Sequence, residues 1–248
     1  MQNKKILILG GSGFVGKNLL SKINQNENSV SIVSRKKIFS KYKVIVGNLI
    51  NDHEKIKKSF FDFDIIFNCS GELKDQEKMK KLHVDALSKI ASFLSSECLK
   101  KKKKIRWIQL SSIGIFGFNR KKEDIDENSL KDPSNNYEKT KLASEEIIIN
   151  SANEFFEYVI LRPSTIYGIG MKSDFIFRLS RYIKKNFFFY IGSKESIFNL
   201  IHINDVSDAL LMCTKDNAQN EIFNLSCNYK LNEIIKIICS YNKITEPK

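Results

Sequence analysis

The stretch KKILILGGSGFVGKNLL, residues 4–20, determines the expected fold. A short apolar strand runs into a turn that contains Gly10, Gly13 and Gly16, and a helical pattern follows. Glycine suits this turn because it allows unusual backbone angles and lets a pyrophosphate approach bare backbone amides. The N-terminus of the following helix attracts the same anion. The stretch therefore predicts a dinucleotide-binding turn.

Strand and helix patterns alternate after this turn. Apolar strand patterns cover 29–34, 43–49, 64–71, 105–112 and 157–164, and helical spacing covers 77–100 and 134–150. Strands separated by helices need crossover connections and form a parallel sheet. Strands that are apolar throughout fit a sheet covered on both faces. We therefore expect an α/β protein with a Rossmann-like, doubly wound parallel sheet.

The pattern changes near residue 168. Short strands at 198–203 and 221–226, helices at 204–215 and 231–241, and the aromatic cluster FFFY at 187–190 follow. We expect a dinucleotide-binding domain over 1–167 and a small C-terminal substrate-binding region over 168–248. The strand and helix within 200–226 are expected to return to the main domain, and the aromatic cluster is interpreted as core or interface.

Cysteine and histidine usage gives limits on ligands and location. The five Cys residues form no C-x-x-C pair, and the three His residues have no ligand-like spacing. We therefore expect no disulfide framework and no structural metal, and a reducing, cytoplasmic location. No apolar window reaches the length of a membrane span, so we expect no membrane partner.

The formal net charge of +13 has two interpretations. A basic surface is typical of nucleic-acid binding, but Lys, Ile and Asn are abundant along the whole chain. The densest basic run, KKKKIR at 101–106, has the place of a helix end and a turn into a strand. We therefore favour compositional bias over a nucleic-acid partner.

The end of the second strand bears on cofactor choice. NAD sites usually place Asp or Glu there to bind the ribose hydroxyls. Here the strand runs into Ser34, Arg35, Lys36 and Lys37. Because an Arg can bind a 2′-phosphate with two hydrogen bonds, we predict NADP(H) preference with Arg35 as the main contact. NAD(H), with these residues as solvated loop cations, is the alternative.

A Tyr-x-x-x-Lys pattern occurs twice, at Tyr137/Lys141 and at Tyr190/Lys194. About one copy is expected by chance in a chain this rich in Lys. Tyr137 and Lys141 lie one turn apart on a predicted helix, which follows a strand that ends at Ser112. The second copy follows an aromatic run and contains a glycine, so we interpret it as coincidental.

The first copy has the residues that carbonyl chemistry needs. An ammonium at Lys141 would lower the pKa of the Tyr137 phenol, which could then exchange a proton with a substrate oxygen. Ser112 would hold the same oxygen while a nicotinamide exchanges hydride with the carbon. His83 is interpreted as helix surface or cofactor rim, Trp107 as strand packing, and His202 as a core or interdomain hydrogen-bonding residue.

At this point the sequence resembles the extended short-chain dehydrogenase/reductases, in particular the nucleotide-sugar epimerases, dehydratases and reductases. The resemblance rests on the motifs GGSGFVG (10–16), GNL (47–49), NCSG (68–71), LHVDA (82–86), SSIGIFG (111–117), YEKTK (137–141), LRPSTIYGIG (161–170) and LIHINDVSDALL (200–211). Matches in this order cover most of the chain. They are specific for the family and much less specific for the reaction.

The resemblance implies a role for each matching residue. Ser112, Tyr137 and Lys141 would be catalytic, with Lys141 also on the nicotinamide ribose. Pyrophosphate contacts would come from Gly10, Gly13, Phe14, Val15 and Gly16, adenine contacts from Asn48 and Leu49, and nicotinamide contacts from Ser70. Thr165 and Arg178 would bind the substrate.

Three departures from the family pattern stand out. Asn48 replaces a common Asp, and Ile169 stands where Pro is usual before Gly170. Relatives also continue for several dozen residues beyond the helix at 231–241. Three explanations stay open: an abbreviated substrate lid, a lid completed by another chain, or a lid outside the given sequence.

The resemblance implies an NAD(P)-dependent oxidoreductase acting on a nucleotide-activated sugar. A 4-ketosugar reductase is favoured because NADP(H) suits a consumed reductant and because residues 168–177 resemble such reductases. A 4-epimerase with tightly bound NAD is the alternative, and a 4,6-dehydratase is disfavoured because no acidic pair follows Ser112. A non-enzymatic NADP-sensing or RNA-binding protein on the same fold is the remaining hypothesis. The sequence is compatible with a homodimer but does not determine the oligomeric state.

Overall fold

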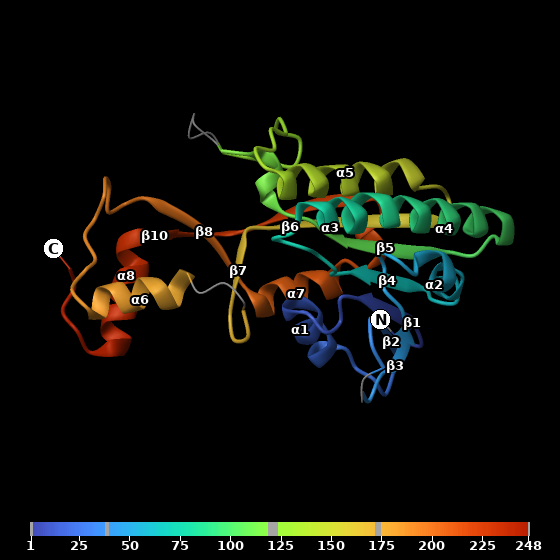
Figure 1. Ribbon diagram of the computed structural model, residues 1–248, viewed down its shortest axis with the longest axis horizontal. Helices are drawn as coiled ribbons and strands as arrows, with labels where there is room; N and C mark the ends of the chain where they lie inside the picture. Colours follow the sequence, from blue (N-terminus) through green and yellow to red (C-terminus); the bar gives the residue numbers. More distant parts are fainter. Residues whose placement is uncertain (1, 38–39, 119–123, 172–174, 248) are drawn as a thin grey trace.

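The structure is a computed structural model that describes residues 2–37, 40–118, 124–171 and 175–247 (Figure 1). Its centre is a seven-stranded sheet in the order β3-β2-β1-β4-β5-β6-β9, in which every pairing is parallel. The strands are β1 (Lys5–Leu9), β2 (Ser29–Ser34), β3 (Lys43–Val46), β4 (Ile65–Asn68), β5 (Ile105–Leu110), β6 (Phe156–Pro163) and β9 (Glu221–Leu225). The strand order reverses between β1 and β4, so the predicted doubly wound Rossmann-like fold is confirmed.

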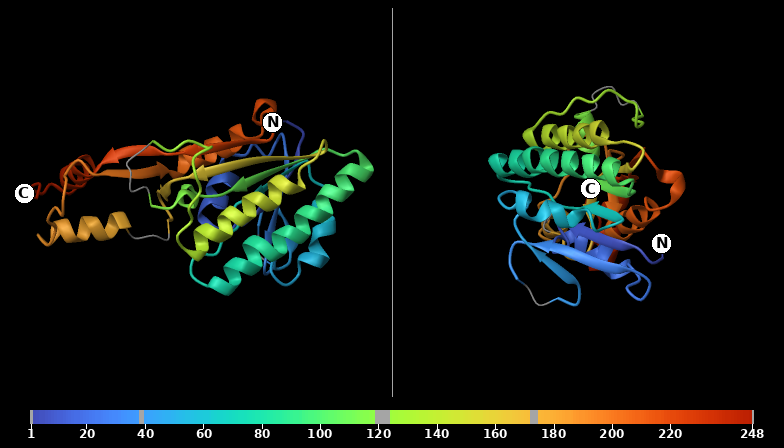
Figure 2. Two further views of the ribbon diagram at one scale, coloured as in Figure 1. Left: turned by 90° about the horizontal axis from the view of Figure 1, so that it is seen from above. Right: turned by 90° about the vertical axis from the view of Figure 1, so that its right-hand side faces the viewer.

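Helices cover both faces of this sheet (Figure 2). One apolar core packs helices α1 (Phe14–Lys22) and α7 (Ile203–Met212) against one face. A second core packs α2 (His53–Phe60), α4 (Leu87–Lys101) and α5 (Asn136–Ser151) against the other. Ile6, Leu7, Ile8 and Leu9 of β1 are all buried because successive side chains enter opposite cores.

The helix predicted over 77–100 is interrupted. It consists of α3 (Gln76–Lys80), a π-helical turn η1 (Lys81–Ala86) and α4. Single π turns inside α-helices are frequent at functional sites, and this one contains His83. Helix α2 was not predicted, because Ile56 and Phe60 are its only apolar residues and two positions are too few to show a helical period.

A second lobe extends from the carboxyl ends of the strands (Figure 1). It contains a three-stranded sheet of β10 (Cys227–Lys230), β8 (Ile197–His202) and β7 (Thr165–Tyr167), with α6 (Phe175–Lys184) and α8 (Leu231–Asn242). Short 3-10 turns η2 (Ile113–Phe116) and η3 (Asp216–Ala218) complete the described elements. The predicted domain boundary near residue 168 stays a prediction. Two elements that follow it in the chain, β9 and α7, lie with the main sheet.

Within the described ranges, no helix combines the length and the apolar character that crossing a bilayer requires.

Candidate active site

Four neighbouring strands end at one edge of the sheet. β1, β4, β5 and β6 are parallel and adjacent, so Gly10, Ser70, Ser112 and Thr165 all follow carboxyl ends on the same side. Ligands of open α/β sheets bind at this edge, at the point where the strand order reverses. All four residues, which were predicted to bind cofactor or substrate or to act in catalysis, therefore lie at one edge of the sheet.

Backbone geometry explains the glycine turn. Gly10 has a φ of 77°, and a Cβ there would lie 2.8 Å from the Cys69 carbonyl group. A Cβ on Gly16 would lie 2.3 Å from the Gly10 oxygen. The turn can therefore close on the start of α1 only with glycine at both positions.

A Gly16→Ala variant is expected to lose nicotinamide dinucleotide binding. The added methyl group must displace the Gly10 carbonyl, and such overpacking costs about 1–3 kcal/mol of stability. Fluorescence titration with NADPH measures binding, and urea unfolding measures stability. Lys17→Ala on the exposed side of the same helix is the control. Unchanged NADPH affinity in Gly16→Ala would contradict the assignment of this turn.

The turn fits the diphosphate of a dinucleotide. Gly13 is the N-cap of α1, and Phe14 and Val15 form the first helical turn, which contains no acidic residue. The Gly13 N–H donates to the Gly10 oxygen at 2.9 Å, which closes the turn. Gly170, in the loop after β7, approaches the Phe14 ring, since a Cβ there would be 3.8 Å away. The second lobe and the glycine turn thus face one another.

The predicted adenine and nicotinamide contacts flank the turn. The Asn48 side-chain oxygen accepts from the Ile50 N–H at 3.0 Å, so it is engaged within its own turn. Leu49 and Ser70 line one small cavity together with Asn68. The Ser70 hydroxyl donates to the Asn68 side-chain oxygen at 2.5 Å. Arg35 is exposed one residue beyond β2.

Lys141 is fixed beside Tyr137 at the end of β5. Asn135 and Glu138 form a reciprocal capping box that sets the start of α5. Lys141 is buried, and its Nζ donates to the Leu110 backbone oxygen at 2.7 Å. The same Nζ lies 6.0 Å from the centroid of the Tyr137 ring. The helix therefore brings the ammonium, the phenol ring and the strand end together.

The prediction that Lys141 lowers the pKa of Tyr137 is wrong. Burial, with an additional contribution from the Glu138 carboxylate, raises the pKa of Tyr137 to about 12. Burial also lowers the pKa of Lys141 to about 8. The desolvation of the phenol outweighs an ammonium whose proton already binds a backbone carbonyl. At neutral pH, Tyr137 is therefore a protonated acid.

Ser112 lies next to the first turn of α5. Its Oγ accepts from the Gly114 N–H at 3.1 Å and so caps η2. A Cβ on Gly114 would lie 3.3 Å from this Oγ and 3.1 Å from the Glu138 Cγ. The Ser112 hydroxyl therefore lies near the residue that follows Tyr137, with its own proton available to donate.

His83 was predicted to lie on the helix surface or at the cofactor rim. It is 4% exposed, which excludes the helix surface, and the cofactor rim stays a prediction. Its Nε2 accepts from the Glu72 N–H at 3.1 Å, and this makes Nδ1 the donor to Thr140 Oγ1 at 2.9 Å. The Thr140 hydroxyl donates to the Tyr137 backbone oxygen at 3.0 Å, and the His83 and Tyr137 rings meet edge to face. The π turn thereby braces the catalytic candidate.

A His83→Gln variant is expected to change the pH dependence of stability. Burial, and then the charge of Lys141, lowers the pKa of His83 from 6.5 to about 3. Between these values the unfolded chain binds more protons than the folded chain, so wild-type stability falls as the pH falls from 6.5 toward 3. The variant lacks this contribution.

Urea unfolding at pH values on both sides of 6.5 measures the difference. At neutral pH the variant is about 1–3 kcal/mol less stable because its polar partners lose their hydrogen bonds. The difference in free energy of unfolding between the wild type and the variant should become smaller as the pH falls below 6.5. A difference that is constant with pH would show that His83 is not held neutral.

The two predicted substrate residues lie in the second lobe. Thr165 begins β7 and is exposed near the strand ends, whereas Arg178 is exposed on α6. Residues 172–174, which belong to the reductase-like stretch 168–177, lie outside the described residues. Of the remaining candidates, Trp107 is fully buried as predicted, and His202 caps α7 by accepting from the Asn204 N–H at 3.2 Å.

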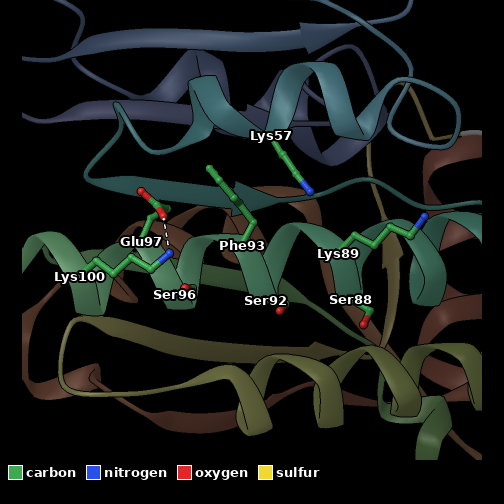
Figure 3. A pocket seen from close by; sticks show the side chains of 8 residues that line it. All are labelled: Lys57, Ser88, Lys89, Ser92, Phe93, Ser96, Glu97 and Lys100. Carbon is green, nitrogen blue, oxygen red and sulfur yellow. Dashed lines mark hydrogen bonds and ion pairs between the residues drawn. The ribbon is translucent and has the colours of Figure 1, made fainter.

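A groove on the outer side of α4 is separate from this edge (Figure 3). Lys57 of α2 lies over the Phe93 ring of α4, and Lys100 pairs with Glu97. All other lining residues belong to α4. The groove therefore contains none of the residues at the strand ends.

Sequence comparison finds relatives that cover most of the chain. The chain is 24% identical to an N-acetyl-α-D-glucosaminyl-diphospho-ditrans,octacis-undecaprenol 4-epimerase of Escherichia coli O157:H7, over 90% of the chain and 67% of that protein. It is 23% identical to a GDP-6-deoxy-D-talose 4-dehydrogenase of Aggregatibacter actinomycetemcomitans, over 95% of the chain and 79% of that protein.

A solved structure of similar fold is the UDP-glucuronic acid 4-epimerase of Bacillus cereus in complex with NAD. Its TM-score is 0.76 at 21% identity, over 98% of this chain and 86% of that one. The model of the NAD dependent epimerase/dehydratase family matches residues 6–226. The chain therefore belongs to the NAD dependent epimerase/dehydratase family.

Proposed function

We propose that this protein is a nicotinamide-dependent reductase of a 4-ketosugar attached to a nucleoside diphosphate. The observation that carries the proposal is the protonated, buried phenol of Tyr137 beside the buried ammonium of Lys141 at the end of β5. Reduction of a ketone requires an acid at the carbonyl oxygen. The Tyr137 phenol is protonated at neutral pH and therefore holds the proton that this step needs.

Each residue has a stated role in this proposal. Tyr137 donates its proton to the C4 oxygen, and Ser112 donates a hydrogen bond to the same oxygen. Lys141, which the Leu110 oxygen holds in place, binds the ribose of the nicotinamide. A bound nicotinamide supplies the hydride. The diphosphate of the cofactor binds to the glycine turn, at Gly10, Gly13, Phe14, Val15 and Gly16. The adenine binds to Asn48 and Leu49, and the nicotinamide binds to Ser70. The substrate binds to Thr165 and Arg178.

NADP(H) is the cofactor that the end of β2 favours. The residue after Ser34 is an exposed Arg, whereas NAD-binding proteins usually place a carboxylate there to bind the ribose hydroxyls. An Arg35→Ala variant should bind NADPH about 10-fold or more weakly, since a hydrogen bond to a charged group contributes about 1.5–3 kcal/mol. NADH affinity should not change. Fluorescence titration with both cofactors measures this, and a loss of equal size for NADH would contradict the role of Arg35.

A 4-epimerase with tightly bound NAD is the second candidate. The relative from Escherichia coli is named as a 4-epimerase and the one from Aggregatibacter as a 4-dehydrogenase, so both names refer to position 4 of a sugar. An epimerase also uses an acid and base at this position, but it returns the hydride to the same sugar. The two candidates therefore differ in net cofactor consumption.

One experiment separates them. The purified protein is mixed with NADPH and a panel of nucleotide 4-ketosugars, and the absorbance of the reduced cofactor is followed. Loss of absorbance with a ketosugar supports the reductase. Interconversion of nucleotide sugars without net oxidation, together with copurified NAD, supports the epimerase. A protein that binds the cofactor but gives neither oxidation nor interconversion would overturn both candidate functions. The homodimer stays a prediction that size-exclusion chromatography tests.

A further inference from the structure

The tip of the second lobe exposes a dense group of apolar side chains. Helix α6 and the segment that follows it present Phe177, Tyr182, Phe187, Phe189 and Ile191, which are 63%, 55%, 71%, 68% and 83% exposed. We call these five side chains the α6 surface. Exposed apolar side chains that gather on one segment of the chain mark interaction sites, whereas isolated ones are common on any protein.

The fold separates these side chains from the core of the lobe. Ile183 is buried and Leu179 packs beside it, so α6 has one inward face. Phe188 and Tyr190 pack against the same core, while their neighbours in the chain point outward. The Phe187 N–H donates to the Tyr182 oxygen at 2.9 Å, which joins the helix end to the following segment. The lobe therefore already has its own core without the α6 surface.

The charge around the α6 surface is mainly positive. Residues 175–194 contain five Lys or Arg and no Asp or Glu. Of the nearby acids, Glu195 pairs with Lys230, and the Glu246 carboxylate lies close enough to act on Tyr190. Arg181, Lys184 and Lys185 are exposed on α6 and its end, among the aromatic side chains. In a twofold dimer built on this surface, the same cations would face one another. A second copy of the chain is therefore disfavoured as the partner, and an anionic partner with an apolar interior is favoured.

We propose that the α6 surface docks on an anionic lipid bilayer. Aromatic and aliphatic side chains would enter the boundary between headgroups and acyl chains, and the cations would bind lipid phosphates. Figure 1 shows α6 and α8 at the end of the molecule farthest from α4, so the lobe tip can reach a flat surface without obstruction by the main sheet. This inference does not depend on the proposed reaction.

Vesicle cosedimentation of the full chain tests the proposal. Binding is expected to vesicles of phosphatidylcholine with phosphatidylglycerol, to weaken in high salt, and to be far weaker with phosphatidylcholine alone. The triple variant Arg181→Gln/Lys184→Gln/Lys185→Gln should lower the partition coefficient on the order of 100-fold, because each cation near the surface contributes about fivefold. The double variant Phe187→Gln/Phe189→Gln should also release the protein.

Matched variants control for total charge and total apolar exposure. Lys55→Gln/Lys58→Gln/Lys101→Gln removes three exposed cations elsewhere, and Leu73→Gln/Leu130→Gln removes two exposed apolar side chains. Both should bind vesicles like the wild type, and circular dichroism checks that every variant is folded. Equal losses in control and test variants, or no vesicle binding by the wild type, would overturn the proposal.

Two further outcomes would also overturn it. Retention of an oligonucleotide that competes with vesicles and needs Phe187 and Phe189 would identify nucleic acid as the partner. A dimer that dissociates in Phe187→Gln/Phe189→Gln would identify a second copy of the chain. Because vesicle binding needs no turnover, an inactive protein that binds vesicles refutes only the proposed reaction, and an active protein that does not bind refutes only this inference.

Discussion

A Tyr137→Phe variant is expected to lower kcat for ketosugar reduction by about 10²–10⁴-fold, the usual contribution of a general acid. The change removes only the hydroxyl, so the ring keeps its edge contact with His83 and the ammonium of Lys141 keeps its bond to Leu110. Binding of NADPH should change little. Initial rates with saturating cofactor measure the first effect, and fluorescence titration measures the second.

The chain offers a matched control in its second Tyr-x-x-x-Lys copy. Lys194 Nζ lies 4.7 Å from the centroid of the Tyr190 ring, closer than the 6.0 Å of Lys141 to Tyr137. If the pair alone produced activity, Tyr190→Phe would be the more damaging change. We expect it to leave kcat unchanged, because Tyr190 packs in the second lobe away from β5. A fully active Tyr137→Phe would refute the proposed acid.

An Arg162→Met variant is expected to lose about 3–5 kcal/mol of stability. Arg162 and Glu145 are 0% and 1% exposed, and the guanidinium donates to the carboxylate at 3.0 Å and 2.7 Å. It also donates to the Glu127 backbone oxygen at 3.1 Å. Without Arg162, the Glu145 carboxylate stays buried without its counter-charge, and this desolvation is the source of the loss. Urea unfolding at neutral pH measures it.

An exposed ion pair controls for the loss of charge itself. Lys81 contacts Glu77 at 2.6 Å on the surface, and Lys81→Met should cost about 0–1 kcal/mol. Arg162→Met/Glu145→Met should recover much of the loss, because no buried charge then remains. Since Glu145 lies one helical turn after Lys141, the single variant should also disturb the catalytic helix. A loss below about 1 kcal/mol in Arg162→Met would contradict the account.

The sequence predicted the main fold because its signals are local. The glycine turn, the apolar strands and the helix around Tyr137 each carry a pattern that neighbouring residues set, and the structure has these elements with small differences at their ends. Residues that act through distant partners were not predicted. His83 depends on Glu72 and Thr140, and Arg162 on Glu145 and Glu127, and no spacing in the sequence indicates such pairs.

The predicted direction of the Tyr137 pKa shift was wrong for a related reason. The spacing of Tyr137 and Lys141 indicates that an ammonium is near, but it does not indicate how far the phenol is withdrawn from water. Burial depends on the packing of His83 and the strand ends around the ring, which is a property of the whole fold. The direction of the shift therefore required the structure.

Strand β9 has a consequence for synthesis on the ribosome. It completes the edge of the sheet next to β6, and the Asn220 N–H bonds to the Tyr158 oxygen at 2.8 Å across a long intervening segment. While residues 164–220 are still being made, β6 has an unpaired edge that invites pairing with other nascent chains. Translation slowed in this interval should lower the yield of soluble protein more than an equal delay before β6.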